Sequence, residues 1–175
     1  MSPSRSYDFG DLGLLSGPPD PSFVSASRIA AELLGVEYGK VTLLDAVANR
    51  VRIRAAFGFD PNGIGLDWSE TDLPLCRKIM SDQSIVGIGE ANEVASTRRS
   101  PFLQALKGRS YLGAPIFDPA GTAVGTLCVI GQAPRIWSER QKEQIAELAG
   151  LVSQAITLKA ALATIRLLSP PMTRA

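Results

Sequence analysis

The chain has 175 residues, and its 18 Lys and Arg against 17 Asp and Glu give a formal net charge of +1. This length is typical of one domain, and 45% hydrophobic with 20% charged residues excludes wholesale disorder. The even charge balance provides no basic surface for nucleic acid or an anionic membrane. The sequence contains no histidine, which excludes Ser-His-Asp and Cys-His catalysis and histidine-ligated zinc, iron or haem on this chain. We therefore expect no metal and no cofactor.

The cellular compartment is predicted from the cysteines and from hydropathy. Cys76 and Cys128 are too few for a four-cysteine zinc site, and nothing in the sequence argues for an oxidising compartment. Asp8 and Gly10 stand where a signal peptide would need an apolar run. The weakly charged stretch 110–134 contains a turn at 118–121, which indicates two strands rather than a membrane span. We expect a soluble cytoplasmic protein.

The N-terminal part is predicted as a leader followed by a helix. Residues 1–19 are rich in Ser, Gly and Pro and are expected to be flexible, with an apolar patch of Leu12, Leu14 and Leu15 loosely docked. Asp20 is the predicted N-cap of a helix, and Pro21 occupies its first position. Apolar residues at helical spacing continue to Leu34, and Gly35 ends the run.

The middle of the chain predicts short alternating elements. Residues 40–44 and 51–57 indicate strands, and 58–66, with its Pro and Gly, a loop. A short helix over 72–80, a buried strand over 84–89 and a short helix over 97–106 follow.

A hairpin and a long helix complete the predicted domain. Strands over 110–117 and 122–130 flank the turn Asp118-Pro119-Ala120-Gly121. Ser138 is the predicted N-cap of the last helix, with Gln141 completing a capping box, and the helix runs to about Leu168 before Pro170-Pro171. The order α-β-β-α-β-α-β-β-α predicts an α+β fold with an antiparallel sheet over residues 20–168, and a tail over 169–175.

The C-terminal half contains a set of motifs: the strand 111–116 (Tyr-Leu-Gly-Ala-Pro-Ile), Gly121, the strand 125–130 (Gly-Thr-Leu-Cys-Val-Ile) and the segment Pro134-Arg135-x-Trp137-Ser138. In these motifs the chain resembles the GAF domain, a sensory relative of the PAS fold. Upstream, Leu75-Cys76, the stretch 85–91 and Ser100-Pro101 are similar to weaker family motifs, with Glu90 in place of the usual Asp.

The resemblance implies a fold and a role. It implies a central antiparallel sheet of five or six strands, with the terminal helices on one face and a small-molecule pocket on the other. It also implies a regulatory domain of signal-transduction proteins such as two-component systems, usually a dimer.

The hairpin pattern predicts which face holds the pocket. Tyr111, Gly113 and Pro115 are expected on one face with Val124, Thr126 and Cys128, because strand side chains alternate. The opposite face is aliphatic and is expected to pack against the terminal helices. The first face suits a ligand cavity with a few polar anchors, or alternatively a slightly polar core layer filled by its own side chains. We predict ligand contacts from Tyr111, Thr126, Cys128 and Cys76.

Three further positions have two interpretations each. Trp68 is either a lid over the pocket or plain core. Arg52 and Arg54 share one side of their strand and form either an anion clamp or, the interpretation we favour, a solvated edge strand. Glu90 is expected to cap a loop or pair with an arginine such as Arg98 or Arg99, and a ligand contact is the alternative.

The predicted function is a non-catalytic small-molecule sensor and dimerisation domain, with an unidentified ligand. The helices 20–34 and 138–168 are expected to form a homodimer, against the alternative of a monomer whose helices only cover the sheet. A different alternative is a thiol enzyme resembling free methionine sulfoxide reductases, with Cys76 and Cys128 as the reacting pair. The bilin- and haem-binding branches of the family are excluded because the chain lacks histidine.

Overall fold

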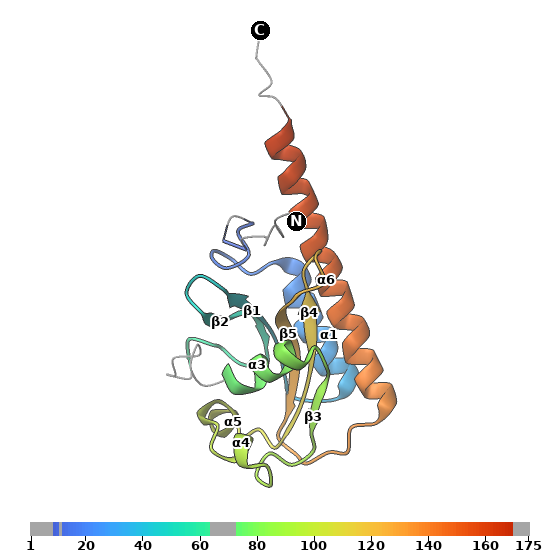
Figure 1. The fold of residues 1–175 in the computed structure, drawn as a ribbon. Helices are drawn as coiled ribbons and strands as arrows, with labels where there is room; N and C mark the ends of the chain where they lie inside the picture. The colour runs from blue at the N-terminus through green and yellow to red at the C-terminus, as the bar shows by residue number, and fades with distance from the viewer. Residues whose placement is uncertain (1–8, 11, 64–72, 170–175) are drawn as a thin grey trace.

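The computed structural model describes residues 9–10, 12–63 and 73–169. A five-stranded antiparallel sheet in the order β2-β1-β5-β4-β3 forms its centre (Figure 1). The strands are β1 (Tyr38–Asp45), β2 (Arg50–Phe57), β3 (Val86–Ile88), β4 (Ser110–Phe117) and β5 (Ala123–Gly131). The helices are α1 (Pro21–Leu34), α3 (Leu73–Asp82), α4 (Ala95–Arg98), α5 (Pro101–Ala105) and α6 (Glu139–Leu168). The predicted α+β class and the antiparallel sheet are confirmed.

The ends of the two long helices follow the predicted signals. The Asp20 carboxylate accepts a hydrogen bond from the Ser22 amide at 2.8 Å, and Gly35 ends α1 in the left-handed conformation at φ 64°. Ser138 and Gln141 form the complete capping box at the start of α6. These local signals determine where α1 begins and ends and where α6 begins.

The terminal helices cover one face of the sheet. Figure 1 shows α1 and α6 side by side on that face, with α6 extending beyond the sheet. The sheet contributes a wholly apolar layer to this core: Val41, Leu43, Leu112, Ala114, Ile116, Leu127 and Val129. The helices contribute the facing layer, including Phe23, Ala30, Leu34, Ile145, Val152 and Ile156. The predicted aliphatic face is therefore confirmed.

One residue lies on the opposite face from the one predicted. The β4–β5 register changes between Ile116 and Phe117, so that Ile116 pairs with Gly125 and Phe117 with Ala123. Val124 is the extra residue of this irregularity and packs into the helix-side core. The prediction that Val124 shares a face with Thr126 is wrong, because a bulge interrupts the alternation between them.

The described part of the leader packs against the domain. Phe9 and Leu14 are buried in the helix-side core, and Leu12 and Leu15 pack at its edge. The Arg54 guanidinium donates hydrogen bonds to the carbonyls of Leu14, Ser16 and Gly17. Arg54 thus holds the leader backbone, a role that neither sequence interpretation included.

Arg52 and Glu90 each have an ion-pair partner. Arg52 pairs with Asp45 at 3.0 Å, across the β1–β2 hairpin. Glu90 accepts a hydrogen bond from the Asn92 amide at 3.0 Å and pairs with an arginine, as predicted, but this arginine is Arg109 and not Arg98 or Arg99. The reason is that the chain before β4 returns alongside the loop after β3, where the Ala91 amide bonds to the Arg109 carbonyl at 2.6 Å.

The predicted helix over 97–106 consists of two short helices, α4 and α5. Ser100 has extended backbone at φ −67° and ψ 113°, and its side chain caps α5. Pro101 causes the break, because proline disfavours helical backbone at the residue before it.

Helix α6 is the one helix within the described ranges that is long and apolar enough, by length and composition alone, to cross a membrane. Its Ile145, Ala149, Val152 and Ile156 are buried against the sheet. Packing against the sheet therefore explains the apolar residues on the buried side of α6. It does not explain the apolar residues of α6 that are exposed.

Candidate functional site: a buried polar cluster beneath α3

The face of the sheet opposite the terminal helices carries a group of buried polar side chains. The polar cluster, as we call it, consists of Lys40 and Thr42 from β1, Thr126 and Cys128 from β5, Tyr111 from β4 and Cys76 from α3. All six are 0% exposed. In the β1–β5 register Lys40 lies opposite Cys128 and Thr42 opposite Thr126, so these four side chains share one face.

Thr126 connects the cluster. Its hydroxyl lies 2.6 Å from the Thr42 hydroxyl, 3.5 Å from the Cys76 sulfur and 3.1 Å from the Cys128 sulfur. The Tyr111 hydroxyl lies 2.9 Å from the Cys128 sulfur and is the last member of this series of contacts. These contacts satisfy hydroxyls and thiols that would otherwise be costly to bury.

Lys40 brings a positive charge into this layer. Its ammonium lies 4.5 Å from the centroid of the Phe102 ring, in cation–π geometry. Lysine is almost never fully buried unless it is compensated, so a lysine that is 0% exposed marks the most unusual environment in the core. Its charge favours ionised groups next to it.

The two thiols differ in how readily they ionise. Burial opposes ionisation of Cys128, but the hydrogen bond from Cys76, the charge of Lys40 and the hydrogen bonds from Thr126 and Tyr111 lower its pKa to about 6. The hydrogen bond with Cys128 and burial raise the pKa of Cys76 well above its ordinary value. Burial and the two neighbouring thiols raise the pKa of Tyr111. One negative charge shared by the thiol pair, stabilised by Lys40, is the ionised form that this arrangement favours.

Four of the five predicted contact residues come together here. Tyr111, Thr126, Cys128 and Cys76 are all members of the polar cluster. Trp68, the predicted lid, lies outside the described residues. In this structure the four side chains hydrogen-bond to one another, as in the alternative of a polar core layer.

The sequence interpretation missed Lys40 and Thr42. A signal was present, because strand alternation separates Lys40 and Thr42 from Val41 and Leu43. Their meaning depends on the β1–β5 register, which joins residues far apart in the chain. Within the described ranges, no group of three or more His, Cys, Asp or Glu side chains could hold a metal ion.

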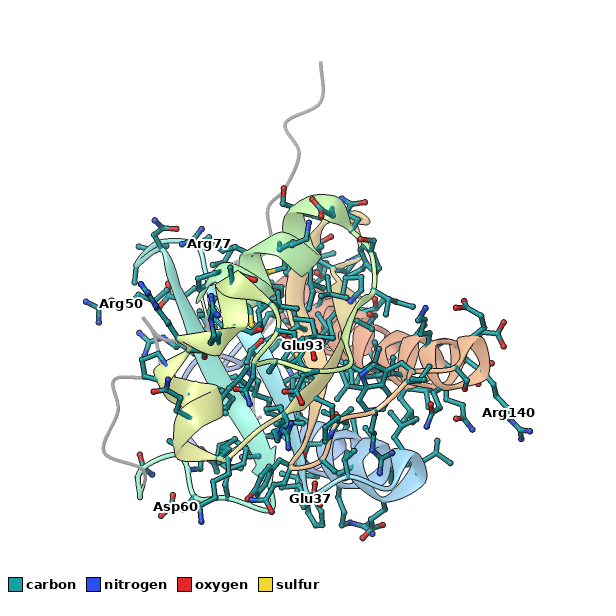
Figure 2. All side chains as sticks on the ribbon, turned by 90° about the horizontal axis from the view of Figure 1, so that it is seen from below. Glu37, Arg50, Asp60, Arg77, Glu93 and Arg140 are labelled. Atoms are coloured by element: carbon teal, nitrogen blue, oxygen red, sulfur yellow. The ribbon has the colours of Figure 1, made fainter. Side chains whose placement is uncertain are left out.

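The charged surface differs from this interior. Figure 2 shows Arg50, Asp60 and Arg140 projecting outward at the rim of the molecule, seen from below. Among the charged residues that the structure describes, Lys40 is the one that is 0% exposed, and Asp45 follows at 8%.

The chain belongs to the GAF domain family. The family model matches residues 22–156, from the first turn of α1 to the middle of α6. This range includes the whole sheet and every member of the polar cluster. The resemblance seen in the sequence is confirmed, and a comparison with curated proteins finds no match.

Solved structures with the same fold come from several kinds of protein. A photoproduct-state GAF domain from Synechocystis has a TM-score of 0.66 at 19% identity, covering 84% of this chain and 97% of its own. The GAF domain of an Acinetobacter phosphoenolpyruvate-protein phosphotransferase has a TM-score of 0.65 at 19% identity, covering 90% and 97%. A free methionine-R-sulfoxide reductase from Neisseria meningitidis has a TM-score of 0.63 at 14% identity, covering 90% and 87%. At these identities the likeness concerns the fold alone.

Proposed function

We propose that this GAF domain is a non-catalytic cytoplasmic sensor, which binds a small molecule over the polar cluster and transmits the signal through α1 and α6. The observation that carries the proposal is the position of the cluster. It lies on the sheet face opposite the terminal helices, and its six polar or thiol-bearing side chains lie together there, all of them 0% exposed. Domains of this family occur in chemotaxis and histidine-kinase sensor proteins, which supports a signalling role.

Ligand binding on this face requires a change in the cluster. Cys76 enters from α3, whereas its partners Thr42 and Thr126 come from the sheet. A ligand with hydrogen-bonding groups would replace the contacts between α3 and the sheet. Movement of α3 against β4 and β5 would then reach α6, which packs on the other side of the same strands.

Native mass spectrometry of the purified chain, followed by thermal-shift measurements across a metabolite panel, tests the proposal. We expect a bound small molecule, or a panel compound that raises the melting temperature. The Thr126→Val variant should reduce that shift, because Thr126 connects the cluster. Thr157→Val is the matched control, since Thr157 is exposed on α6. A clean apo mass with no thermal response would overturn the sensor proposal in favour of a scaffold without a ligand.

A second function is favoured by one observation, the shared contact of the two thiols with the Thr126 hydroxyl. Cys76 and Cys128 are both free, and their sulfurs lie 3.5 Å and 3.1 Å from the same Thr126 hydroxyl. A thiol reductase needs an attacking and a resolving cysteine within reach of each other. A reductase assay on free methionine sulfoxide, with Cys76→Ser as control, distinguishes the two functions. Turnover that is lost in the variant would establish the enzyme, and absence of turnover would exclude it.

A further inference from the structure

A second concave site lies at the end of the sheet, away from the polar cluster. It is a cavity of about 240 Å³ between the loop after β3, the helices α4 and α5, and the turn before β4. These elements form the lower end of the molecule in Figure 1. The lining residues are Ala91, Asn92, Thr97, Arg98, Leu103, Gln104, Lys107, Gly108 and Arg109.

The charged residues of the lining are all positive. It contains Arg98, Lys107 and Arg109 but no Asp or Glu, on a chain whose net charge is only +1. Arg109 is compensated by Glu90, which is not part of the lining. Arg98 and Lys107 form no ion pair with any residue in the part of the chain that the structure describes. Glu93, labelled in Figure 2, belongs to the same loop but not to the lining.

The walls of the cavity are held in place by backbone hydrogen bonds. The Ala91 amide donates to the Arg109 carbonyl at 2.6 Å, and the Arg109 amide donates to the Gly131 carbonyl at 2.7 Å. The buried Thr97 hydroxyl donates to the Ala91 carbonyl at 2.7 Å. A ligand here would meet a preformed site and would not have to order its walls.

Lys107 occupies a backbone conformation that lysine disfavours. Its φ is 53°, in the left-handed region that glycine normally takes at the end of a helix. The neighbouring Gly108 is needed for a different reason, because a Cβ there would lie 2.7 Å from the Ile130 side chain. The Lys107 side chain is exposed and contributes nothing to the core. The backbone strain at this exposed position supports a role for the charge of Lys107.

We propose that this cavity binds a small organic anion through a phosphate group, held by Arg98, Lys107 and Arg109. A phosphate matches the site better than a single carboxylate, because its dianion can accept hydrogen bonds from several cations at once. The bidentate pair with Glu90 fixes the Arg109 guanidinium at the rim. The site does not depend on the proposed sensor function, since it shares no residue with the polar cluster.

The test is a titration of the full chain with inorganic phosphate at constant ionic strength, followed by amide chemical shifts. We expect saturable shifts at Asn92, Thr97 and Lys107–Arg109. Lys107→Gly should weaken binding about tenfold, as expected for one charged hydrogen bond. The same variant should leave the melting temperature unchanged or raise it, because glycine accepts the left-handed backbone.

Arg99→Gln is the matched control, because Arg99 is exposed, neighbours Arg98 and lies outside the lining. Arg98→Gln should weaken phosphate binding, whereas Arg99→Gln should not. Equal losses in the two variants would mean nonspecific attraction and would overturn the site. Scattered or unsaturable shifts would do the same. Tighter binding of succinate than of phosphate would show the assigned ligand class to be wrong.

Discussion

Gly113 is the residue that lets the polar cluster close. It lies opposite Cys128 in the β4–β5 register, beneath α3. A Cβ at this position would lie 2.6 Å from the Ile79 side chain, 2.9 Å from the Tyr111 hydroxyl and 3.1 Å from the Cys128 sulfur. A glycine at this position therefore has a steric reason, and backbone flexibility is not needed to explain it.

We predict that Gly113→Ala lowers the free energy of unfolding by about 1–3 kcal/mol, as overpacked core sites do. Gly150→Ala is the matched control, because Gly150 lies within α6 and an added Cβ meets nothing within 4 Å. That variant should be more stable than the wild type by about 0.5–1 kcal/mol. Denaturant unfolding measures both. Equal stabilities for the two variants would mean that the cluster repacks freely.

The pKa shifts of Cys76 and Cys128 predict how the two thiols titrate. Because the pKa of Cys128 is lowered to about 6 and that of Cys76 is raised, the folded chain should form one thiolate near pH 6 and resist forming the second. Thiolate absorbance near neutral pH should vanish in Cys128→Ser. In Cys76→Ser the remaining thiol loses the hydrogen bond that lowers its pKa and should ionise at higher pH. Two thiolates ionising together at an ordinary thiol pKa would contradict this account.

At the scale of elements, helix ends were the most predictable features. Asp20, Gly35 and Ser138 act through contacts within a few residues of themselves, so the sequence is sufficient to find them. The break between α4 and α5 was missed because the apolar spacing of 97–106 continues through it. The local backbone preference before Pro101 decided the outcome.

The cap of α6 is open to a direct test. Ser138→Ala removes the side chain that accepts from the Gln141 amide at 3.2 Å. The variant should lose about 1 kcal/mol of stability, the usual cost of an N-cap. Ser96→Ala, at an exposed position, should change stability by less than about 0.5 kcal/mol. A loss in Ser96→Ala as large as in Ser138→Ala would mean that the cap is not responsible.

At the scale of the molecule, the exposed apolar residues gather on the terminal helices. Leu151, Leu158, Leu162 and Ile165 of α6 are 45–60% exposed, and Leu33 of α1 is 51% exposed. An amphipathic helix with apolar residues outside its buried stripe provides a surface for another helix. This arrangement supports the proposed homodimer through α1 and α6.

We predict that the chain sediments at twice its mass of 18.6 kDa and that Leu158→Glu shifts it to the monomer. A charge at Leu158 would have to be buried against the partner helix, which is costly. Ile136→Glu is the control, because Ile136 is 97% exposed and precedes α6. A wild-type chain that remains at 18.6 kDa at high concentration would remove the dimer.

Local sequence patterns were sufficient to predict the strands, the two terminal helices, the family and the aliphatic face of the hairpin. These depend on local propensity, side-chain alternation and motifs, all of which can be read along one strand or helix. The sequence also brought Tyr111, Thr126 and Cys128 to one face, since they belong to a single hairpin.

The roles of the remaining side chains follow from contacts between segments that are distant in the chain. Lys40 joins the cluster because β1 pairs with β5, and Arg109 binds Glu90 because the chain before β4 returns beside the loop after β3. Arg54 holds the leader, and Val124 turns to the helix side at a bulge. The chain has no histidine, which excludes whole classes of catalysis. The side chains that remain important in the two candidate sites are therefore those of Lys, Arg and Cys. Their roles depend on contacts between segments distant in the chain, which local sequence patterns do not encode.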